Sequence, residues 1–462
     1  MTLKKANNST TKASASEKDW TKGSTTTNLL ALSWPIIISD TFNLIGPTID
    51  MIWVGKLGAA SIAGVGVAAL ILMVATLGIW GINTGLRAMV ARFVGAGDTK
   101  GAIHVCQQAL IVSTSYSIVT AAIGITFAEP LLALLGIGPD VISEGVIYIR
   151  IAFIGMVVVS LHIVAESIMQ TSGDTLTPMK ISIIIRILHV ILAPFLIFGW
   201  WIFPRLGVSG AAITNIVAMS VGCTFAFWVV FTGRSRLRLT LKNFRLDLRT
   251  IWRMVKIGLP ASVMGAQQSL GRIALLGLIA PFGTLAVAGY ALLERIGQLV
   301  WIPASGFGRG ASVLVGQNLG AQQPERAEKS VWLAVGFVEI VVFTFSAVML
   351  FWSETVIRIF SPDPELIEVA SSFLAISAIG YMPLVLNAVL EWSLTGAGDT
   401  IPPMIVEVLR TWAITLPLAY FLSKITGLGV HGVWWAIVIG IVMSASAYVI
   451  YFRLGIWKRK KI

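Results

Sequence analysis

Acidic side chains lie within several of the long apolar stretches of this 462-residue sequence. A carboxylate placed in hydrocarbon costs at least about 2.5 kcal/mol, so each one is a candidate for a functional role. Such a group can bind and release a proton, or it can supply a hard oxygen ligand to Na⁺. The candidates identified in this way are Asp40, Asp50, Glu166 and Glu391.

Asp50 lies near the end of the first apolar stretch, six residues before Lys56. Inside the membrane its carboxylate would bind a proton or form part of a Na⁺ site. The alternative is a position at the membrane interface, where Asp50 is only solvated.

Asp40 lies ten residues earlier, about 15 Å along a helix from Asp50 and rotated from it by about 80°. It is either a second proton-binding residue or a carboxylate hydrated by a cavity. Pro47 stands between the two acids, and we expect it to kink this helix and free a backbone carbonyl.

Glu166 and Glu391 occupy equivalent places in the two halves of the sequence, each in a helix that precedes a Gly-Asp-Thr loop. His162 stands one helical turn before Glu166, and Asn387 holds the same place before Glu391. This symmetric set is a candidate for a direct role in function.

The alternative for these two acids is an ion pair with an arginine of the following helix, Arg186 or Arg410. Glu407 lies three residues before Arg410 on the same helical face. This spacing predicts an internal ion pair between Glu407 and Arg410.

The composition requires a membrane around these charges. The chain is 56% hydrophobic and only 12% charged, whereas a soluble domain is about 25% charged. Apolar stretches of this length predict an all-α integral membrane protein with twelve spans. The predicted spans cover residues 28–54, 60–84, 105–128, 145–170, 178–202, 209–232, 254–280, 285–308, 330–353, 368–395, 402–422 and 429–452.

Basic residues are distributed unevenly between the predicted loops. Of the 34 Lys and Arg residues, 25 fall on the side that carries both termini, five on the other side and four within spans. This asymmetry predicts a plasma-membrane or inner-membrane protein with both termini in the cytoplasm. The net charge of +12 therefore reflects topology and contact with the lipid bilayer, not binding of nucleic acid.

The second half of the sequence repeats the first at an offset of 225 residues, called here the repeat register, and this offset slips by three beyond Pro178-Met179. Pro35 matches Pro260, Glu166 matches Glu391, and the loop that begins at Gly173 matches the loop that begins at Gly398. We therefore expect two six-helix bundles related by a pseudo-two-fold axis along the membrane normal, with a cavity between them. The predicted organisation is a disordered cytoplasmic tail (1–27), an N-terminal lobe (28–232), a basic linker (233–253), a C-terminal lobe (254–452) and a basic cytoplasmic tail (453–462).

Several motifs resemble the multidrug and toxic compound extrusion (MATE) family. They are Leu32-Ser-Trp-Pro35, Asp50-Met-Ile-Trp-Val-Gly55, Leu314-Val-Gly-Gln-Asn-Leu-Gly-Ala321, the paired Gly-Asp-Thr-x-x-Pro-Met stretches and the Gly-Val-x-Gly loops at 207–210 and 429–432. The resemblance extends from residue 28 to 452. It implies an antiporter that exports amphipathic, often cationic compounds in exchange for H⁺ or Na⁺.

The resemblance also assigns roles to residues. It makes Asp50 the cation-coupling carboxylate, with Asn215 as a further residue of the same site, and it gives Glu391 and its counterpart Glu166 a role in binding substrate or a second cation. Members of the family usually place an Asn and an Asp in the fifth helix, where this sequence has His189 and Ala193. One carboxylate and one imidazole make a poor site for Na⁺ and a better one for H⁺, so H⁺ is favoured. Alternatively, His189 only forms an interhelical hydrogen bond.

Other functions are less well supported. A flippase for lipid-linked sugars or precursors of the same wider superfamily is the main alternative, although the predicted buried charges are mainly acidic. The sequence has no nucleotide-binding loop or catalytic motif, so we expect a transporter and not an enzyme, without a cofactor. We expect it to act as a monomer on small-molecule substrates.

Overall fold

The computed structural model describes residues 18–134, 138–242 and 244–462. Within these ranges twelve helices are long and apolar enough to cross a membrane. They are α1 (Thr25–Gly55), α2 (Ala59–Gly95), α3 (Thr99–Thr126), α5 (Pro139–Ser172), α6 (Leu176–Phe198), α7 (Val208–Thr232), α8 (Leu248–Ile279), α9 (Thr284–Gly320), α10 (Pro324–Phe351), α12 (Pro364–Gly396), the composite helix of α13 (Ile401–Val408), a π-helical stretch (Leu409–Thr415) and α14 (Leu416–Lys424), and α15 (Val430–Leu454). The predicted all-α fold with twelve spans is confirmed.

Shorter elements connect the long helices. Helices α4 (Ala128–Ala133) and α11 (Ser353–Arg358) follow α3 and α10, and short 3₁₀ turns form at Ala280–Phe282 and Ile456–Arg459. Gly207 and Gly429 precede α7 and α15 with nearly the same backbone angles, φ 57° and 56° with ψ −131° and −141°. Only glycine adopts this region readily, so both halves of the chain have a glycine where this turn recurs.

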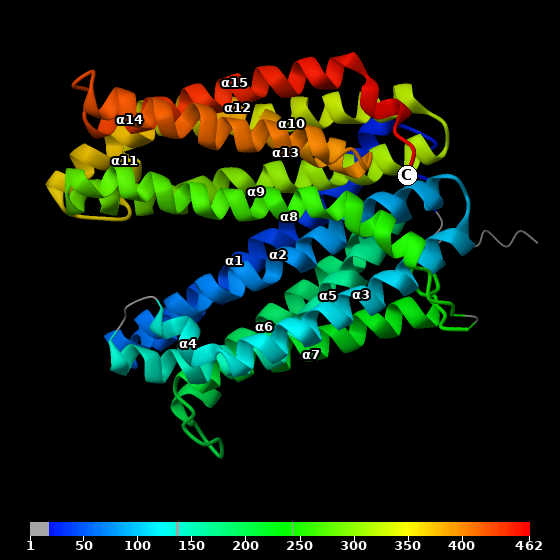
Figure 1. Ribbon diagram of the computed structural model, residues 1–462, viewed down its shortest axis with the longest axis horizontal. Coiled ribbons are helices and arrows are strands. Elements are labelled where there is room, and N and C mark those ends of the chain that lie inside the picture. The colour runs from blue at the N-terminus through cyan, green and yellow to red at the C-terminus, as the bar shows by residue number, and fades with distance from the viewer. Residues whose placement is uncertain (1–17, 135–137, 243) are drawn as a thin grey trace, which may run out of the picture.

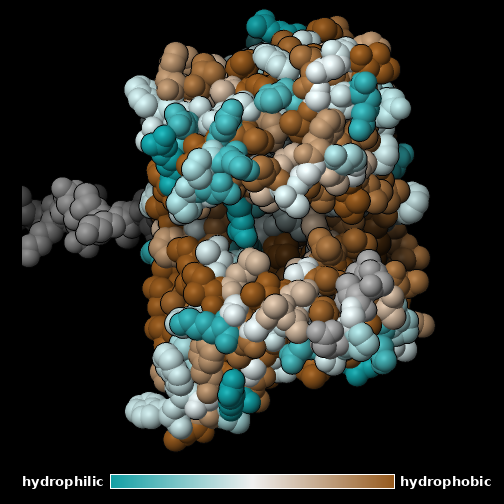
Figure 2. All heavy atoms as spheres, turned by 90° about the vertical axis from the view of Figure 1, so that its left-hand side faces the viewer, coloured by the Kyte–Doolittle hydropathy of each residue, from teal (hydrophilic) through white to brown (hydrophobic). Residues whose placement is uncertain are grey.

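The helices form two bundles (Figure 1). We call α1–α7 the N-lobe and α8–α15 the C-lobe. The lobes approach each other at the end where the C-terminus lies, called here the terminal end, and they diverge toward the opposite end. Figure 2 looks onto that opposite end and shows a recess between the two lobes.

Helices α1 and α2 of the N-lobe pack against α9 and α8 of the C-lobe. Glycines line this seam because a side chain at these positions would collide with the facing helix. Gly95 lies against the backbone of Gln317, and Gly320 lies against the backbone of Arg92. In the repeat register Gly95 corresponds to Gly320 and Arg92 corresponds to Gln317, so the seam follows the internal repeat.

Two helices of the seam are longer than the sequence predicted. Helices α2 and α9 extend to Gly95 and Gly320, so Arg87, Arg92 and Arg309 lie on helices and not in loops. A hydropathy window ends a span at its first charges. Here Arg92 and Arg309 have polar partners in the facing lobe, and Arg87 has one on α5 of its own lobe, which allows the helices to continue.

The segments predicted as tails are also partly folded. Residues 1–17 lie outside the described residues, but α1 begins at Thr25 and Trp20 is buried against Gly173. At the other end of the chain, Trp457 is fully buried and stacks on Phe452 at 4.7 Å. Both segments fold because a large aromatic side chain gains more from burial than the short chain loses in entropy.

The predicted linker is shortened in the same way, because α8 begins at Leu248. Asp247 caps this helix and accepts hydrogen bonds from the Thr250 hydroxyl and amide and from His104. These hydrogen bonds hold the pKa of the Asp247 carboxyl well below its usual range.

Candidate functional site

Asp50 on α1 and His189 on α6 form a buried pair within the N-lobe. The distance from His189 Nε2 to Asp50 Oδ1 is 2.8 Å. The exposed fraction of the side chain is 1% for His189 and 12% for Asp50, so Asp50 does not lie at a solvated interface. The pair brings together the carboxylate and the imidazole that the sequence singled out.

The surroundings of His189 select one protonation pattern. Its Nδ1 atom is buried and has no hydrogen-bond partner among the described residues. An unpaired N–H donor in this position would cost more than a bare lone pair, which favours a proton on Nε2 donated to Asp50 Oδ1. The second oxygen of Asp50 is then the acceptor for an additional proton.

Other polar groups near this pair are engaged elsewhere. Arg186, one turn before His189, donates from Nε and Nη2 to Asn43 Oδ1, both at 3.2 Å. It lies over Gly46 of α1, where a side chain would collide with its guanidinium. On the other side, one turn after His189, Ala193 is fully buried in an apolar cluster.

Two further predicted residues of this site make no direct contribution in the described structure. Asn215 on α7 is half-buried and has no hydrogen bond within the described part of the chain. Pro47 lies within α1, which continues through it as a single helix from Thr25 to Gly55. A proline there removes the backbone hydrogen bond to the carbonyl of Asn43 and leaves a point of weakness in the helix.

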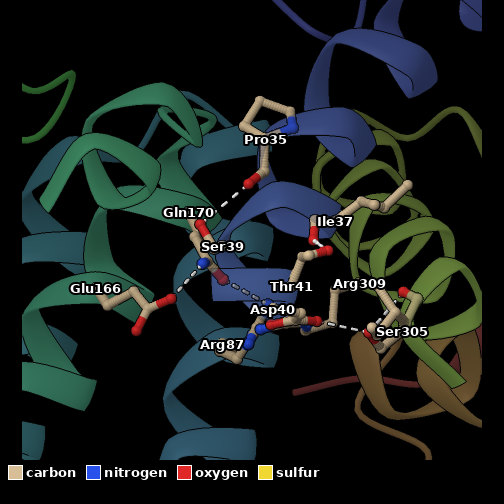
Figure 3. Close-up of polar contacts among 11 residues, drawn as sticks. Pro35, Ile37, Ser39, Asp40, Thr41, Arg87, Glu166, Gln170, Ser305 and Arg309 are labelled. Carbon is tan, nitrogen blue, oxygen red and sulfur yellow. Dashed lines mark hydrogen bonds and ion pairs between the residues drawn. The ribbon is translucent and has the colours of Figure 1, made fainter. Parts of the chain in front are cut away.

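Asp40 belongs to a separate cluster at the seam between the lobes (Figure 3). It forms an ion pair with Arg309 of α9 and accepts a hydrogen bond from the Ser305 hydroxyl at 2.6 Å. The side chains of Arg309 and Asp40 are 14% and 21% exposed. Asp40 therefore joins the two lobes and is not part of the Asp50 site.

Glu166 lies on the N-lobe side of the same cluster. Its Oε1 atom accepts a hydrogen bond of 2.7 Å from the Gln170 amide, and Gln170 Oε1 accepts one of 3.1 Å from Arg87. The expected alternative of an ion pair with Arg186 is not observed. His162 is buried one turn away, and its Nδ1 atom has no partner among the described residues.

The equivalent region of the C-lobe has different chemistry. Glu407 and Arg410 form the predicted ion pair, with Nη2 and Oε2 at 2.5 Å, and the Tyr448 hydroxyl contacts Glu407 at 3.4 Å. Glu391 is half-buried nearby and forms no ion pair with Arg410 in the described structure. Asn387 donates to the Ser444 hydroxyl at 2.7 Å and thus joins α12 to α15.

Sequence reasoning missed the arginines of the seam. It assigned Arg87 and Arg309 to loops, and it counted the buried charges as mainly acidic, whereas Arg87, Arg186, Arg309 and Arg410 all lie within the helical bundle. The apolar residues that flank Arg87 and Arg309 on both sides were the available signal.

A binding site for Na⁺ as the coupling ion would need several oxygen ligands. At the Asp50 pair the described residues provide one carboxylate and one imidazole nitrogen. No group of three or more His, Cys, Asp or Glu residues within the described ranges is arranged to hold a metal ion. Asp50 and His189 therefore offer a coupling ion one carboxylate and one imidazole.

Comparison with known proteins gives consistent results. The sequence matches the MatE family model at residues 35–195 and 260–421, two segments whose first residues, Pro35 and Pro260, are counterparts in the repeat register. It is 24% identical over 434 residues to the probable multidrug resistance protein YoeA of Bacillus subtilis, with 93% of each chain covered. It is 25% identical over 429 residues to the FAD transporter of Shewanella oneidensis, with 92% of this chain and 94% of the relative covered.

Among solved structures, the fold is similar to the outward-facing conformation of a multidrug resistance MATE family transporter of the MOP superfamily. The TM-score is 0.88 at 23% sequence identity, with 94% of this chain and 96% of that chain covered. The two-lobe architecture is therefore shared over nearly the whole chain.

Proposed function

This chain belongs to the MatE family of membrane transporters, and we propose that it is a secondary active antiporter that exports small amphipathic compounds in exchange for H⁺. The observation that carries the proposal is the buried hydrogen bond of 2.8 Å between Asp50 and His189. A carboxylate and an imidazole in contact inside a bundle can store one proton and release it when their surroundings change.

The position of Asp50 on α1 connects proton binding to the cleft between the lobes. Helix α1 packs on α6 of its own lobe and on α9 of the C-lobe. In the proposed cycle Asp50 takes up a proton from outside, α1 bends at Pro47, and the substrate is displaced outward. Release of the proton on the inner side then restores the site. The coupling requires only that proton and substrate stabilise different conformations.

The proposal includes an orientation and an oligomeric state. The terminal end, which carries the described N-terminal residues, the linker and the C-terminus, is proposed to face the cytoplasm because the basic residues gather there. The divergent end then faces outward. Since the cleft is built from two lobes of a single chain, a monomer is sufficient for transport.

The experiment is dye efflux from liposomes that contain the purified protein, with a pH gradient or a Na⁺ gradient imposed separately. We expect the pH gradient to drive efflux of wild type, and we expect Asp50→Asn to reduce the rate to that of protein-free liposomes because the amide cannot exchange a proton. Glu354→Gln is the matched control, because Glu354 is an exposed carboxylate on α11 of the other lobe, paired with Arg358. Efflux driven equally well by Na⁺ alone, or a fully active Asp50→Asn protein, would contradict proton coupling.

A further inference from the structure

Two arginines from different lobes converge at the seam. Arg87 projects from α2 and Arg309 from α9, and both point toward Asp40 in Figure 3. Both side chains are mostly buried but keep a small exposed part, which is 14% for Arg309. Two guanidinium groups this close repel each other unless negative charge is placed beside them.

Only one of the two arginines is paired with a carboxylate. Arg309 has an ion pair with Asp40. Arg87, in contrast, has no ion pair within the described residues, and it donates instead to the neutral amide oxygen of Gln170 at 3.1 Å. The same Gln170 donates to Glu166 and holds that carboxylate one amide away from Arg87. Arg87 is thus a charged group in a low-dielectric region whose direct partner is neutral.

The internal repeat shows that this pair is not a by-product of the duplication. In the repeat register Arg309 corresponds to Thr84, and Arg87 corresponds to Ser312. Each lobe therefore supplies one arginine, and the other lobe has a small hydroxyl residue at the equivalent position. Within the repeat, the two arginine positions lie about one helical turn apart. Both arginines reach the same region of the seam because the pseudo-two-fold axis brings α2 and α9 face to face.

An aromatic surface adjoins the charges. The Arg87 guanidinium lies over the ring of Trp392, at 5.8 Å from its centroid, and Trp392 in turn packs against Gly308 of α9. A half-buried tryptophan beside two guanidinium groups provides a flat apolar face next to a site for negative charge.

We propose that Arg87 and Arg309 bind the carboxylate, sulfonate or phosphate group of the transported compound, and that the substrates include amphipathic anions. This inference rests on the proposed function and specifies its substrate class. Arg87 supplies the direct contact, because guanidinium groups bind such oxyanions through paired N–H donors. Arg309 offsets the charge of Asp40 and joins the site only while the lobes are closed at the terminal end. An anionic substrate therefore stabilises this conformation.

The test is equilibrium binding of carboxyfluorescein, an aromatic polyanion, to the full-length protein in nanodiscs of neutral phosphatidylcholine, measured by fluorescence anisotropy. Removing a charged hydrogen-bond donor should weaken binding by about tenfold to a hundredfold in Arg87→Gln. Arg87→Lys keeps the charge and should bind more tightly than Arg87→Gln. Arg358→Gln, at an exposed arginine on α11 at the divergent end, is the control and should bind as wild type does.

Competition distinguishes the source of the anion. Displacement of the dye by inorganic pyrophosphate indicates a soluble anion, and displacement by phosphatidylglycerol in the nanodisc indicates a lipid headgroup; either result supports the site. Equal affinity of wild type and Arg87→Gln would overturn it, as would a wild-type protein that binds ethidium and not carboxyfluorescein. Because no ion gradient is present in this assay, failure of proton coupling through Asp50 does not affect the outcome.

Discussion

The two lobes share one helical scaffold but enclose different chemistry. The N-lobe holds the Asp50–His189 pair, in which a carboxylate contacts an imidazole. The C-lobe holds the Glu407–Arg410 pair, in which a carboxylate contacts a permanently charged guanidinium. In the repeat register Asp50 corresponds to Leu275, so the C-lobe has no counterpart of this carboxylate.

This difference indicates how a duplicated transporter can assign different tasks to its halves. Glycines along the seam are kept in both lobes because close backbone approach requires them. Polar side chains inside a bundle are constrained less by packing and more by their own partners, so they diverge. We infer that the N-lobe pair changes its protonation during the cycle, whereas the C-lobe pair remains charged and maintains the structure.

The largest effect on stability is expected from breaking the C-lobe pair. In Glu407→Gln the buried guanidinium of Arg410 loses its counter-charge, which costs about 3–5 kcal/mol. Thermal unfolding of the detergent-solubilised protein should show a clear decrease in the midpoint, with recovery in the double variant Glu407→Gln/Arg410→Met. If Glu407→Gln instead lost proton coupling and kept the stability of wild type, the coupling role would belong to the C-lobe pair.

A smaller effect on stability, combined with a larger effect on function, is expected for the N-lobe pair. His189→Ala removes a buried hydrogen bond to a carboxylate, which is worth about 1.5–3 kcal/mol. We expect the pH dependence of efflux to change because Asp50 loses the imidazole, while unfolding shifts less than in Glu407→Gln. His189→Asn, which can still donate to Asp50, should restore stability but not the pH profile. An unchanged pH profile in both variants would make His189 a structural residue.

The glycine seam tests the symmetry of the scaffold itself. Gly85 faces the backbone carbonyl of Met254, whereas its counterpart Gly310 faces the side-chain hydroxyl of Ser33. An added methyl group should cost about 1–3 kcal/mol in Gly85→Ala and less in Gly310→Ala, because a side chain can move aside more easily than a backbone. The rate of labelling of a cysteine introduced at the terminal end would report how far each substitution opens the seam. If both variants lose the same stability, the difference between a backbone contact and a side-chain contact does not determine the cost.

The smallest effect is expected at the linker. Asp247 caps α8 and has a lowered pKa because it accepts hydrogen bonds from Thr250 and His104. A lowered pKa means that its contribution to stability is present above the ordinary carboxyl pKa of about 3.9 and is lost as the pH falls through the lower folded-state value. Asp247→Ala should therefore reduce the unfolding midpoint slightly at pH 7, and the difference from wild type should diminish in acid. A difference that stays constant with pH would exclude this ionisation as the cause.

Much of the architecture follows from local properties of the sequence. Twelve apolar stretches dictate twelve helices because a bilayer leaves no other partner for the backbone. The internal repeat indicates two equivalent lobes, and the spacing of Glu407 and Arg410 predicts their ion pair from a single helical turn. Asp50 and His189 were identified as one site through their resemblance to a family pattern, and spacing along the chain alone would not have joined them.

The tertiary structure decided which charges meet. The sequence placed Arg87 and Arg309 outside the predicted spans, yet the packing of α2 and α9 across the seam brings both to Asp40 and gives Asp40 a partner in the other half of the chain. It likewise gave Glu166 the Gln170 amide as its hydrogen-bond partner and gave Arg186 the amide oxygen of Asn43. Hydropathy and periodicity are properties of one helix and therefore determine the helices and their order. An ion pair between helices depends on the rotation and depth of both, and only the packed fold fixes these.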